Sequence, residues 1–473
     1  MTAVKFGTDG WRGIIAGDFT FGNVRLCAQA VANYVKDHGF TGKGVAVGYD
    51  TRFASEDFAS AAAEVVAGNG IKVWLCPRQA PTPVVSHMVL ANGAAAGIVI
   101  TASHNPAAWN GFKVKSDRGA SAPGEIIAQI EESIAHLEPE RDIISMPLST
   151  ALRERLIEYQ DPFPAYSRRL GDLVNLDDLR QRRMHVAVDS MYGAGAGYFR
   201  TLLDGNAVTV TEINAERNPL FPGIQPEPIA RNLARLSHLV VEQGASIGLA
   251  TDGDADRIGV IDEHGHFLNQ HQVFALLCMY LLDTRAERGP LVKTITSTTM
   301  INKLGRLYDV PVYETAVGFK YVAPLMLEKN ALVGGEESGG YGFRGHVPER
   351  DAILAGLYLL DFMGRTGKTA SQLLDYLYER VGPHYYDRVD QHVSPSQQRA
   401  LPNTLASQQP HSLAATNVVA TDTTDGFRYI LEDESWLLLR LSGTEPLLRI
   451  YAEAQSRERV STLLEEGKRL AGV

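Results

Sequence analysis

The sequence has few cysteines and no excess of positive charge. Its three cysteines lie in apolar surroundings without CxxC spacing, at Cys27, Cys76 and Cys278. This pattern argues against a disulfide framework or a thiolate metal site, so we expect these thiols to be buried and reduced. The formal net charge of −10 argues against nucleic acid and anionic membranes as partners, because both favour a basic protein surface.

Long hydrophobic runs are missing as well. The longest, VFALLCMYLL at residues 273–282, is too short to cross a bilayer and predicts a core helix. The opening stretch MTAVKFGTDGWRG lacks the apolar segment of a signal peptide. We therefore expect a cytoplasmic protein, a monomer or a homodimer, with neither a nucleic-acid nor a membrane partner.

What the sequence contains instead is a repeated alternation of short β-branched runs and helical patterns. Strands are expected at 44–50, 71–76, 95–101, 185–190, 245–251, 291–296, 310–315 and 331–335. The intervening patterns predict helices at 56–69, 196–203, 229–242, 270–282, 298–307 and 319–329. Strands separated by helices favour parallel sheets covered on both faces. We expect an α/β fold with three tandem α/β/α domains whose sheets are mixed but mostly parallel.

The last part of the chain has a different pattern. Residues 391–426 are rich in Gln, Ser, Pro, Asn and Thr, and strand-like runs follow at 427–433, 435–442 and 447–454 before a helix at 457–470. This order predicts a smaller C-terminal α+β domain. A chain of 473 residues is too long for one core, and the expected domains are 1–150, 151–257, 258–368 and 369–473.

The stretch TASHNP at 101–106 follows a predicted buried strand. Ligand sites of open α/β sheets lie in the loops beyond the carboxyl ends of the strands, which makes Ser103, flanked by His104, a candidate nucleophile. Lys113 lies ten residues further on. Near a hydroxyl that gives or receives a phosphoryl group, a desolvated lysine could act as a general acid or base. A serine that caps a helix is the alternative for this position.

Three carboxylates alternate in ATDGDADRIGVID at 250–262. Asp252, Asp254 and Asp256 are two residues apart, so in a plain strand their like charges would share one face, which is unfavourable without a counter-ion. Oxygen-only ligands favour Mg²⁺ or Mn²⁺, whereas the glycine and the bidentate glutamate of an EF-hand are missing. Arg257 adds a cation that could compensate transferring phosphoryl oxygens. A solvated acidic turn is the weaker alternative, because apolar runs flank this one.

Glycine pairs bracket two glutamates and a serine in GGEESGGYGF at 334–343. The glycines let the backbone approach a ligand closely. Glu336 can accept hydrogen bonds from a polyol such as a sugar, and Ser338 can both donate and accept them. Taken alone, this pattern is also common in surface loops.

A fourth loop, RLSGTEPLLRI at 440–450, gathers cations and hydroxyls. Two guanidinium groups, two hydroxyls and free backbone amides suit a phosphate dianion, and the candidates are Arg440, Ser442, Gly443, Thr444 and Arg449. A β-hairpin with a polar turn and exposed arginines is an equally good interpretation of this segment alone. Further cations could together hold a doubly phosphorylated ligand; they are Arg12, Lys293, Lys320 and Arg350.

Taken together and in this order, TASHNP, DGDADR, GEESGG and RLSGTEP resemble the phosphoserine, magnesium, sugar and phosphate loops of the α-D-phosphohexomutase superfamily. The segments GTDGWRG, NPLFPG and VGFKY also match the usual sequences of that family, and the last adds Gly318 to the candidate ligand-binding residues. The resemblance covers essentially the whole chain. It implies three related α/β/α domains and a smaller fourth domain around a central cleft, to which each domain contributes one loop.

The resemblance also implies an activity. A phosphorylated Ser103 would give its phosphoryl group to a sugar monophosphate, and the resulting hexose 1,6-bisphosphate would turn over and return its other phosphoryl group. Mg²⁺ would be held by the three aspartates and a phosphoserine oxygen, and Lys113 would be the acid/base. Glu336 and Ser338 would bind the 3- and 4-hydroxyls of the sugar. His104 would orient the serine and its phosphate, and the closing domain would grip the phosphate that is not reacting.

Two positions depart from parts of the family. Gly340 stands where some mannose/glucose members have a histidine, which leaves the second acid/base unassigned, and Glu337 stands where the glucosamine branch has glutamine. We expect a glucose-phosphate mutase with mannose phosphates as further substrates. The alternative is a glucose 1,6-bisphosphate synthase on the same scaffold. A Mg²⁺-dependent sugar phosphatase is a less favoured alternative. A non-catalytic sugar-phosphate sensor is also less favoured, because the catalytic residues are intact.

Overall fold

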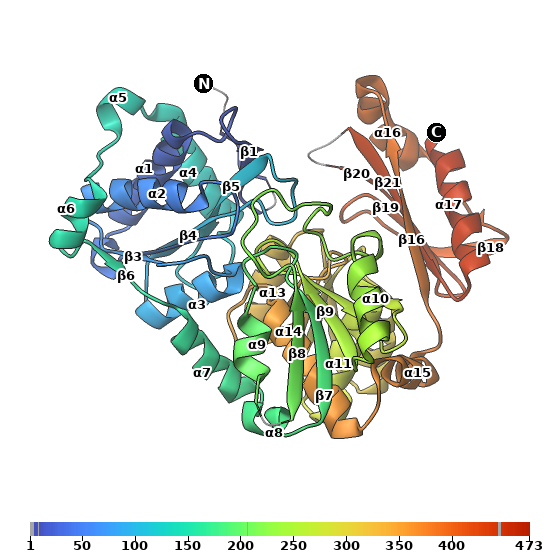
Figure 1. Cartoon of the computed structure of the whole chain (residues 1–473). Coiled ribbons are helices and arrows are strands. Elements are labelled where there is room, and N and C mark those ends of the chain that lie inside the picture. Colours follow the sequence, from blue (N-terminus) through green and yellow to red (C-terminus); the bar gives the residue numbers. More distant parts are fainter. Residues whose placement is uncertain (1–3, 8, 206, 443–445) are drawn as a thin grey trace.

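The chain forms four β-sheets, each with its own helices, arranged in sequence order from blue to red in Figure 1. The computed structural model describes residues 4–7, 9–205, 207–442 and 446–473. The first three sheets mix parallel and antiparallel strands, and the strand pairs of the fourth are antiparallel. The expected fold class is confirmed. Among the described residues, no helix is both long and apolar enough to cross a membrane.

The first sheet has the strand order β1-β5-β4-β2-β3-β6, with β1 (Trp11–Ile14), β2 (Val45–Tyr49), β3 (Val73–Leu75), β4 (Ala96–Ile100), β5 (Trp109–Lys115) and β6 (Ile157–Tyr159). Its helices are α1 (Phe21–Asp37), α2 (Ser55–Gly68), α3 (Thr82–Asn92), α4 (Gly124–His136), α5 (Pro139–Asp142) and α6 (Leu148–Arg153), with a 3-10 turn at Thr41–Lys43. Val45 and Val47 pack into the core that contains α1, α2 and α4, whereas Ala46 faces the core that contains α3, because side chains alternate along a strand. The pairing of β6 with β3 carries this sheet beyond the predicted boundary at residue 150.

The second sheet has the order β11-β10-β9-β7-β8, with β7 (Met184–Asp189), β8 (Val208–Ile213), β9 (Ile247–Thr251), β10 (Ile258–Ile261) and β11 (Phe267–Leu268). Its helices are α7 (Phe163–Leu173), α8 (Leu176–Arg180), α9 (Tyr198–Leu203) and α10 (Ala234–Gln243). The helix expected from residue 229 begins later, because Ala230–Asn232 form a 3-10 turn. Since β10 pairs with β9, the sheet also continues past the predicted boundary at residue 257.

The third sheet has the order β13-β12-β14-β15, with β12 (Leu291–Thr294), β13 (Val312–Thr315), β14 (Val333–Gly335) and β15 (Tyr341–Phe343). Its helices are α11 (Gln270–Met279), which continues into a π-helical turn at Tyr280–Thr284, α12 (Met300–Leu307), α13 (Phe319–Lys329), α14 (Ala352–Thr366) and α15 (Ala370–Val381). Because α15 packs against α11 and α12, we propose that the third domain ends after Val381 and not at residue 368.

The fourth sheet has the order β16-β21-β20-β19-β18-β17, with β16 (Tyr385–His392), β17 (Ser412–Leu413), β18 (Thr416–Asp422), β19 (Phe427–Leu431), β20 (Trp436–Leu441) and β21 (Leu447–Ala454). One face packs against α16 (Pro395–Ser407) and α17 (Arg457–Ala471). On the other face, Trp436 and Leu438 pack against Ile295 of the third domain. The expectations for this region did not include α16, which is anchored by the buried Leu401 and Leu405, four residues apart in a polar segment.

Candidate active site

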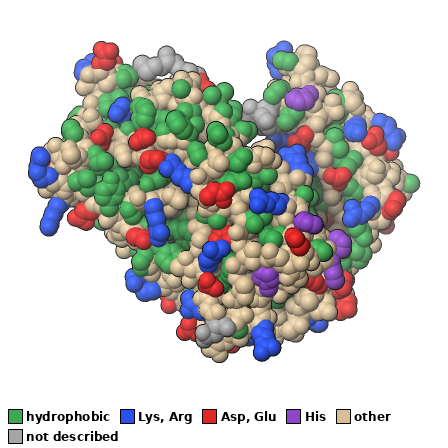
Figure 2. Space-filling model, in the orientation of Figure 1, with side chains coloured by type: hydrophobic (Ala, Val, Ile, Leu, Met, Phe, Trp, Pro, Cys, Tyr) green, Lys and Arg blue, Asp and Glu red, His purple; other side chains and the backbone are tan. Residues whose placement is uncertain are grey.

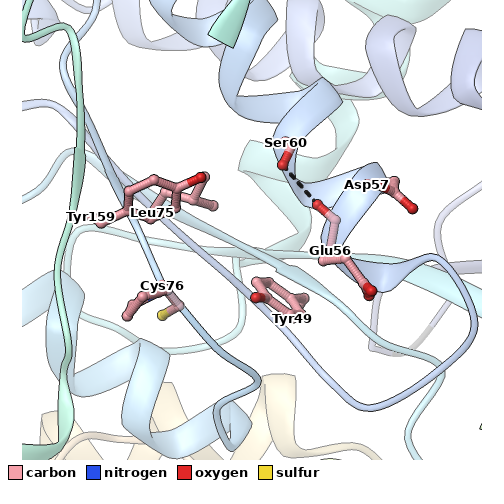
Figure 3. A pocket seen from close by; sticks show the side chains of 8 residues that line it. Tyr49, Glu56, Asp57, Ser60, Leu75, Cys76 and Tyr159 are labelled. Atoms are coloured by element: carbon pink, nitrogen blue, oxygen red, sulfur yellow. Dashed lines mark hydrogen bonds between the residues drawn. The ribbon is translucent and has the colours of Figure 1, made fainter. Parts of the chain in front are cut away.

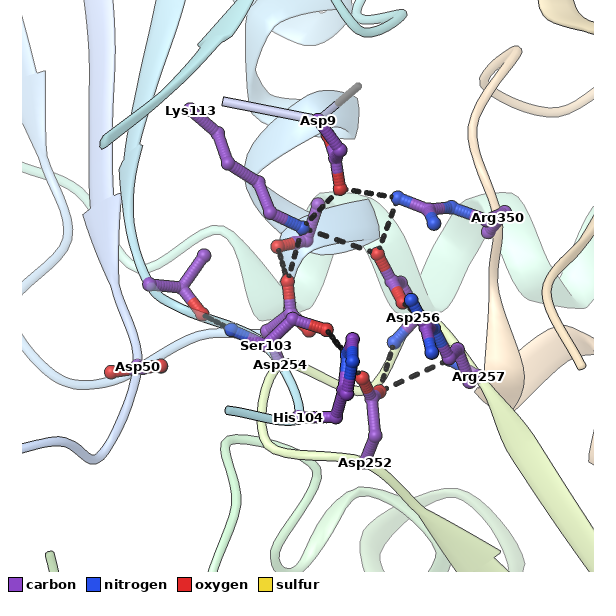
Figure 4. A network of polar contacts seen from close by, with 12 residues as sticks. Asp9, Asp50, Ser103, His104, Lys113, Asp252, Asp254, Asp256, Arg257 and Arg350 are labelled. Carbon is purple, nitrogen blue, oxygen red and sulfur yellow. Dashed lines mark hydrogen bonds and ion pairs between the residues drawn. The ribbon is translucent and has the colours of Figure 1, made fainter. Parts of the chain in front are cut away.

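Three of the predicted loops each follow a central strand of their sheet. The Ser103 loop (101–108) follows β4, the aspartate loop (252–257) follows β9, and the glutamate loop (336–340) follows β14. A ligand site of an open α/β sheet lies beyond the carboxyl ends of its strands. Figure 4 shows side chains of the first two loops converging with Lys113, Asp9 and Arg350.

Ser103 has a left-handed backbone conformation, with φ of 52°, which costs roughly 1–2 kcal/mol for a residue with a Cβ. Its Oγ donates a hydrogen bond to Asp252 Oδ2 at 2.8 Å, and its N–H donates to Thr101 Oγ1 at 2.9 Å. The residue is 1% exposed. The hydroxyl of Ser103 is therefore held in one place, against the aspartate loop.

The Ser103 loop and the aspartate loop touch through their backbones at Gly253. A Cβ atom at this position would lie 2.3 Å from the carbonyl oxygen of Ser103, far inside an ordinary van der Waals contact. Only glycine fits there. The sequence DGD therefore carries a packing requirement as well as two carboxylates.

Arg52 holds the backbone of the Ser103 loop and was not among the predicted residues. It is fully buried. Its guanidinium donates at 2.5 to 2.9 Å to the carbonyl oxygens of Ser103, Asn105, Pro106 and Trp109. Asp50 balances the charge through an ion pair of 3.2 Å. Arginine suits this position because its five N–H donors lie in one rigid plane, but an arginine after a strand is too common to be recognised from sequence.

Asp252, Asp254 and Asp256 form a buried cluster in which one oxygen atom of each lies within 4.8 Å of the others. Asp252 Oδ1 also accepts the backbone N–H groups of Asp256 and Arg257, at 3.0 and 3.1 Å. Within the described part of the chain, Asp254 Oδ1 and Asp256 Oδ1 are buried without a hydrogen-bond partner. Such oxygens are costly, and a hard divalent cation would satisfy them. The donor set therefore fits an ion such as Mg²⁺.

The three carboxyl groups differ in their electrostatic surroundings. Burial, followed by the charges of Asp256 and Asp254, raises the pKa of Asp252. Burial acts in the same direction on Asp254, but the nearby Lys113 ammonium outweighs it and lowers the pKa of that carboxyl below its ordinary value. The negative charge of the cluster is therefore concentrated beside Lys113.

Lys113 on β5 is the central cation of this region. Its Nζ lies 2.7 Å from Asp9 Oδ2, and 2.8 and 3.3 Å from the Oδ2 atoms of Asp254 and Asp256. Burial opposes its charge, but these carboxylates outweigh burial and raise the pKa of Lys113 above its ordinary value. The lysine is thus a protonated group in this arrangement. Asp9, in the GTDG segment, was missed because nothing in the sequence connects it with residue 113.

Arg350 ties the third domain to the same carboxylates. Its Nη2 lies 2.6 Å from Asp9 Oδ2 and 2.7 Å from Asp256 Oδ2. Its Nη1 lies 3.6 Å from Glu336 Oε2. A Cβ atom at Gly340 would lie 2.3 Å from Cδ of Arg350. Arg350 therefore occupies the space that a side chain at position 340 would need, which explains the glycine there.

His104, Arg12 and Arg257 complete the surroundings of Ser103. His104 Nδ1 lies 3.4 Å from the serine Oγ. Burial, followed by the charges of Arg257 and Arg12, lowers the pKa of His104 well below its ordinary value, so the imidazole is neutral near pH 7. Arg12 Nη1 donates to Asn105 Oδ1 at 2.6 Å. Arg257, which directly follows the aspartates, is mostly buried.

The glutamate loop presents one carboxylate and one hydroxyl. Glu336 is buried, and burial raises its pKa although Arg350 acts in the opposite direction. The Oγ of Ser338 is buried and has no hydrogen-bond partner among the described residues, so it can bind a ligand hydroxyl. Glu337, between them, instead contacts the fourth domain.

Lys293, predicted to bind the ligand, is enclosed by protein groups. It is fully buried, and its Nζ lies 3.0 Å from the carbonyl oxygens of Ser297 and Thr298 and 3.2 Å from Glu314 Oε1. These partners use its three N–H donors. Glu314 also pairs with Arg428 of the fourth domain. Lys293 therefore supports the contact between the third and fourth domains.

The predicted phosphate residues lie on the fourth sheet and are described in part. Arg440 on β20 and Arg449 on β21 are directly opposite in register, a like-charge pair that is unfavourable unless anions lie nearby. Ser442 is buried just after β20. Gly443 and Thr444 lie outside the described residues.

Asp425 connects Arg440 with the segment before α13. Its Oδ1 lies 2.9 Å from Arg440 Nε, and its Oδ2 accepts the N–H of Val317 at 3.0 Å. Gly318, with φ of 129°, follows and caps α13, and Lys320 lies in the first turn of that helix. The two candidates from VGFKY are therefore placed beside the fourth sheet.

The surface is hollowed between the N-terminal part of the molecule and the C-terminal domain. Figure 2 shows lysine and arginine side chains along this hollow. A protein with a net charge of −10 thus gathers cations locally, which favours an anionic ligand.

Known proteins resemble this one over most of the chain. Sequence models of the phosphoglucomutase/phosphomannomutase family match its α/β/α domains I, II and III at residues 3–141, 164–265 and 269–381, and its C-terminal domain at 403–469. The chain belongs to this family. It is a phosphohexomutase, an enzyme that catalyses phosphate transfer within sugar phosphates.

Relatives of this phosphohexomutase differ in the sugar that their names give. It is 33% identical, over 98% of both chains, to a phosphoglucomutase/phosphomannomutase of Thermococcus kodakarensis. It is 31% identical, over 96% of both chains, to a phosphoglucosamine mutase of Levilactobacillus brevis. A crystal structure from Thermus thermophilus, described as a phosphomannomutase, is 35% identical with a TM-score of 0.86, and the match covers 100% of both chains.

A separate cavity of about 340 Å³ lies between α2 and β3 of the first domain (Figure 3). Its lining includes Glu56 and Asp57 and, within the described part of the chain, contains no lysine or arginine. The Cys76 thiol also lines it, and burial raises the pKa of this thiol to about 12. An acidic cavity with an unreactive thiol does not suit a sugar phosphate. Cys27, Cys76 and Cys278 are all free and buried, as expected.

Proposed function

We propose that this phosphohexomutase interconverts glucose 1-phosphate and glucose 6-phosphate, and accepts mannose phosphates, through a phosphorylated Ser103 and a hexose 1,6-bisphosphate. The observation that carries the proposal is the single buried cluster formed by Ser103, the three aspartates and Lys113. Its Ser103 Oγ lies 2.8 Å from Asp252, and Lys113 Nζ lies 2.8 Å from Asp254. Phosphoryl transfer depends mainly on such positioning and on charge compensation.

The side chains around Ser103 have different roles in the phosphoryl transfer. Ser103 Oγ carries the phosphoryl group and gives it to a sugar hydroxyl, and the second phosphoryl group of the bisphosphate returns to the same atom. We propose Lys113 as the acid/base of the transfer; in the protonated state described above it can donate a proton to the Ser103 oxygen as the phosphoryl group leaves. The neutral His104 orients the serine, while Arg12 and Arg257 compensate the charge of the phosphoryl oxygens.

We propose Asp252, Asp254 and Asp256, with a phosphoserine oxygen, as the Mg²⁺ ligands. The two buried carboxylate oxygens without hydrogen-bond partners among the described residues support this assignment. When bound, the ion supplies charge neutralisation for the transferring group.

We propose that Glu336 and Ser338 bind the sugar hydroxyls and that Arg440, Arg449, Ser442, Gly443 and Thr444 grip the phosphate that is not reacting. The grip must accept the ligand in both orientations. The position of Arg440 directly opposite Arg449 supports this role, because two neighbouring guanidinium groups can bind one phosphate together. We propose that Gly318 and Lys320, which follow the contact of Val317 with Asp425, also bind the ligand, whereas Lys293 is buried. The second acid/base stays unassigned, since Gly340 has no side chain and Arg350 beside it keeps its proton.

The preference for glucose rests on Glu337, which stands where the glucosamine branch has glutamine. The test is a comparison of glucose, mannose and glucosamine 1-phosphates, each with Mg²⁺ and a trace of the matching bisphosphate. We expect the highest kcat/KM for glucose 1-phosphate. Negligible isomerisation of every sugar would contradict the proposal, and accumulation of bisphosphate only after addition of fructose 1,6-bisphosphate would identify a bisphosphate synthase instead.

A further inference from the structure

Glu337 belongs to the glutamate loop, but its carboxylate contacts another domain. It stands between Glu336 and Ser338, the two residues assigned to the sugar. Its Oε1 accepts hydrogen bonds from Tyr386 OH at 2.9 Å and from Arg388 Nη1 at 3.0 Å. Tyr386 and Arg388 lie on β16, the first strand of the fourth domain.

The contact continues along β16 toward the arginines of the fourth sheet. Arg388 Nε lies 2.9 Å from Asp390 Oδ1 on the same strand. Asp390 is directly opposite Arg449 in the β16–β21 register, and Arg449 is opposite Arg440 in the β21–β20 register. The contacts of one carboxylate of the glutamate loop thus lead to Asp390, which lies opposite Arg449 on the adjacent strand.

Tyr386 is held in place by the interface between the third and fourth domains. Its ring meets His271 of α11 edge-on, with ring centroids 4.1 Å apart, and lies near Trp436 of β20, at 6.2 Å. Burial, followed by the charge of Glu337, raises the pKa of Tyr386 well above its ordinary value, so its hydroxyl remains a donor. The Glu337 side chain is 20% exposed, which strengthens the charge-assisted bonds relative to a solvated pair.

We propose that Glu337 is a positioning residue that fastens the phosphate-gripping domain to the glutamate loop and so retains the bisphosphate in the cleft. This inference rests on the proposed function. In the first transfer the bond between Ser103 Oγ and phosphorus breaks and a bond from phosphorus to the sugar oxygen forms. The sugar hydroxyl loses its proton, and Ser103 Oγ takes up one. If the bisphosphate leaves at this stage, the enzyme is left without its phosphoryl group and is inactive until bisphosphate restores it.

The test uses full-length enzyme phosphorylated on Ser103, with Mg²⁺ and glucose 1-phosphate as the only sugar. Glucose 6-phosphate and free glucose 1,6-bisphosphate are both quantified. In Glu337→Gln, which keeps the size of the side chain and removes its charge, we expect bisphosphate release per turnover to rise about tenfold, the loss expected for about one charge-assisted bond. Activity should decay during the assay and return when bisphosphate is added at saturation.

Glu434→Gln is the matched control. Glu434, in the turn between β19 and β20, also joins the fourth domain to the third, through Arg306 at 2.7 Å and Lys303 at 3.4 Å. It does not contact the glutamate loop, so this variant should release bisphosphate like the unchanged enzyme. Tyr386→Phe removes one half of the Glu337 contact from the other side and should show an intermediate release, which keeps the test informative if Glu337→Gln folds poorly.

The outcomes separate this inference from the proposed function. Equal bisphosphate release by Glu337→Gln, Tyr386→Phe and the unchanged enzyme would overturn the role of Glu337 while leaving the mutase activity intact. Equal increases in Glu337→Gln and Glu434→Gln would also overturn it, because any weakening of the domain contact would then suffice. An unchanged phosphorylated enzyme that forms no glucose 6-phosphate would overturn the proposed function itself.

Discussion

The surroundings of Ser103 and the arginine pair of the fourth sheet are both charged, but they are built differently. Around Ser103, carboxylates and cations from three domains contact one another at 2.6 to 3.3 Å and are almost completely buried. On the fourth sheet, Arg440 and Arg449 stand side by side with like charge. The Ser103 region suits a reaction that breaks and forms bonds, because such a reaction needs groups in fixed positions. The arginine pair suits a ligand that binds in two orientations, because it can bind a phosphate group in either one.

The hydrophobic cores also separate the first three domains from the fourth. One hydrophobic core runs from α3 through the second and third sheets to α14 and α15. The fourth domain has its own core and meets the third through the small cluster around Ile295 and Trp436. The first three domains therefore share a hydrophobic core, while the phosphate grip belongs to a domain that meets the third through a smaller apolar cluster.

The largest effect is expected from Ser103→Ala. Removal of the nucleophile should lower isomerisation by at least roughly four orders of magnitude, with an unchanged melting temperature. Ser60→Ala is the control, because the Ser60 hydroxyl only bonds to a carbonyl within α2 and its loss should leave activity intact. Undiminished turnover by Ser103→Ala would contradict the role of the Ser103 region and its contrast with the fourth sheet.

Gly253→Ala tests the fixed geometry of the Ser103 region. The added methyl group would lie 2.3 Å from the Ser103 carbonyl oxygen, so the two loops must separate, and kcat should fall about 100-fold because a displacement near 1 Å has that effect. Gly171→Ala in α7 is the control, since its Cβ meets nothing within 4 Å. Equal kcat values for the two variants would show that close contact of the loops is unnecessary.

Arg440→Ala tests the phosphate grip. We expect KM for glucose 1-phosphate to rise about tenfold, the effect of losing one charge-assisted contact, with a smaller change in kcat. Arg469→Ala on α17, whose side chain is 70% exposed, should leave both constants unchanged. A loss confined to kcat would instead assign Arg440 to the chemical step, and the comparison between the two regions would fail.

The smallest effect concerns the contact between the third and fourth domains. Burial raises the pKa of Glu314, but Lys293 and Arg428 outweigh it and lower the pKa from 4.5 to about 2. The ionised carboxylate therefore adds stability above pH 4.5 that is lost as the pH falls toward 2. The free energy of unfolding is measured with urea at several pH values between 4.5 and 2. It should fall less steeply with falling pH in Glu314→Gln than in the unchanged enzyme. Glu154→Gln is the control and should behave like the unchanged enzyme. Identical slopes would contradict this ion pair.

The fold and the three loops of the first three domains could be predicted because their signals are local. Alternating strands and helices indicate α/β layers, and a serine or an aspartate trio after a buried strand falls at the edge where ligands bind. The Ser103 hydroxyl and the aspartates do meet. The fourth domain was harder, since α16 and β18 lie in a polar segment whose apolar positions are few.

The supporting contacts could not be predicted, because they join residues far apart in the chain. Arg350 and Asp9 are 341 residues apart and lie 2.6 Å from each other. The contacts of Lys293 could not be predicted for a related reason. It lies on β12 between two parallel neighbours, and sequence does not reveal whether a lysine on a central strand meets ligand or, as here, buried carbonyl groups and Glu314.

The most direct test of the account is the fate of a phosphoryl group on Ser103. The enzyme is labelled with radioactive glucose 1,6-bisphosphate, freed of ligand, and mixed with unlabelled glucose 1-phosphate while the Ser103 peptide and the sugars are followed by mass spectrometry and radioactivity. We predict one phosphoryl group on Ser103 that passes to the sugar within the time of one turnover. A stable label on Ser103 during continued isomerisation, or a label on another residue, would contradict the account.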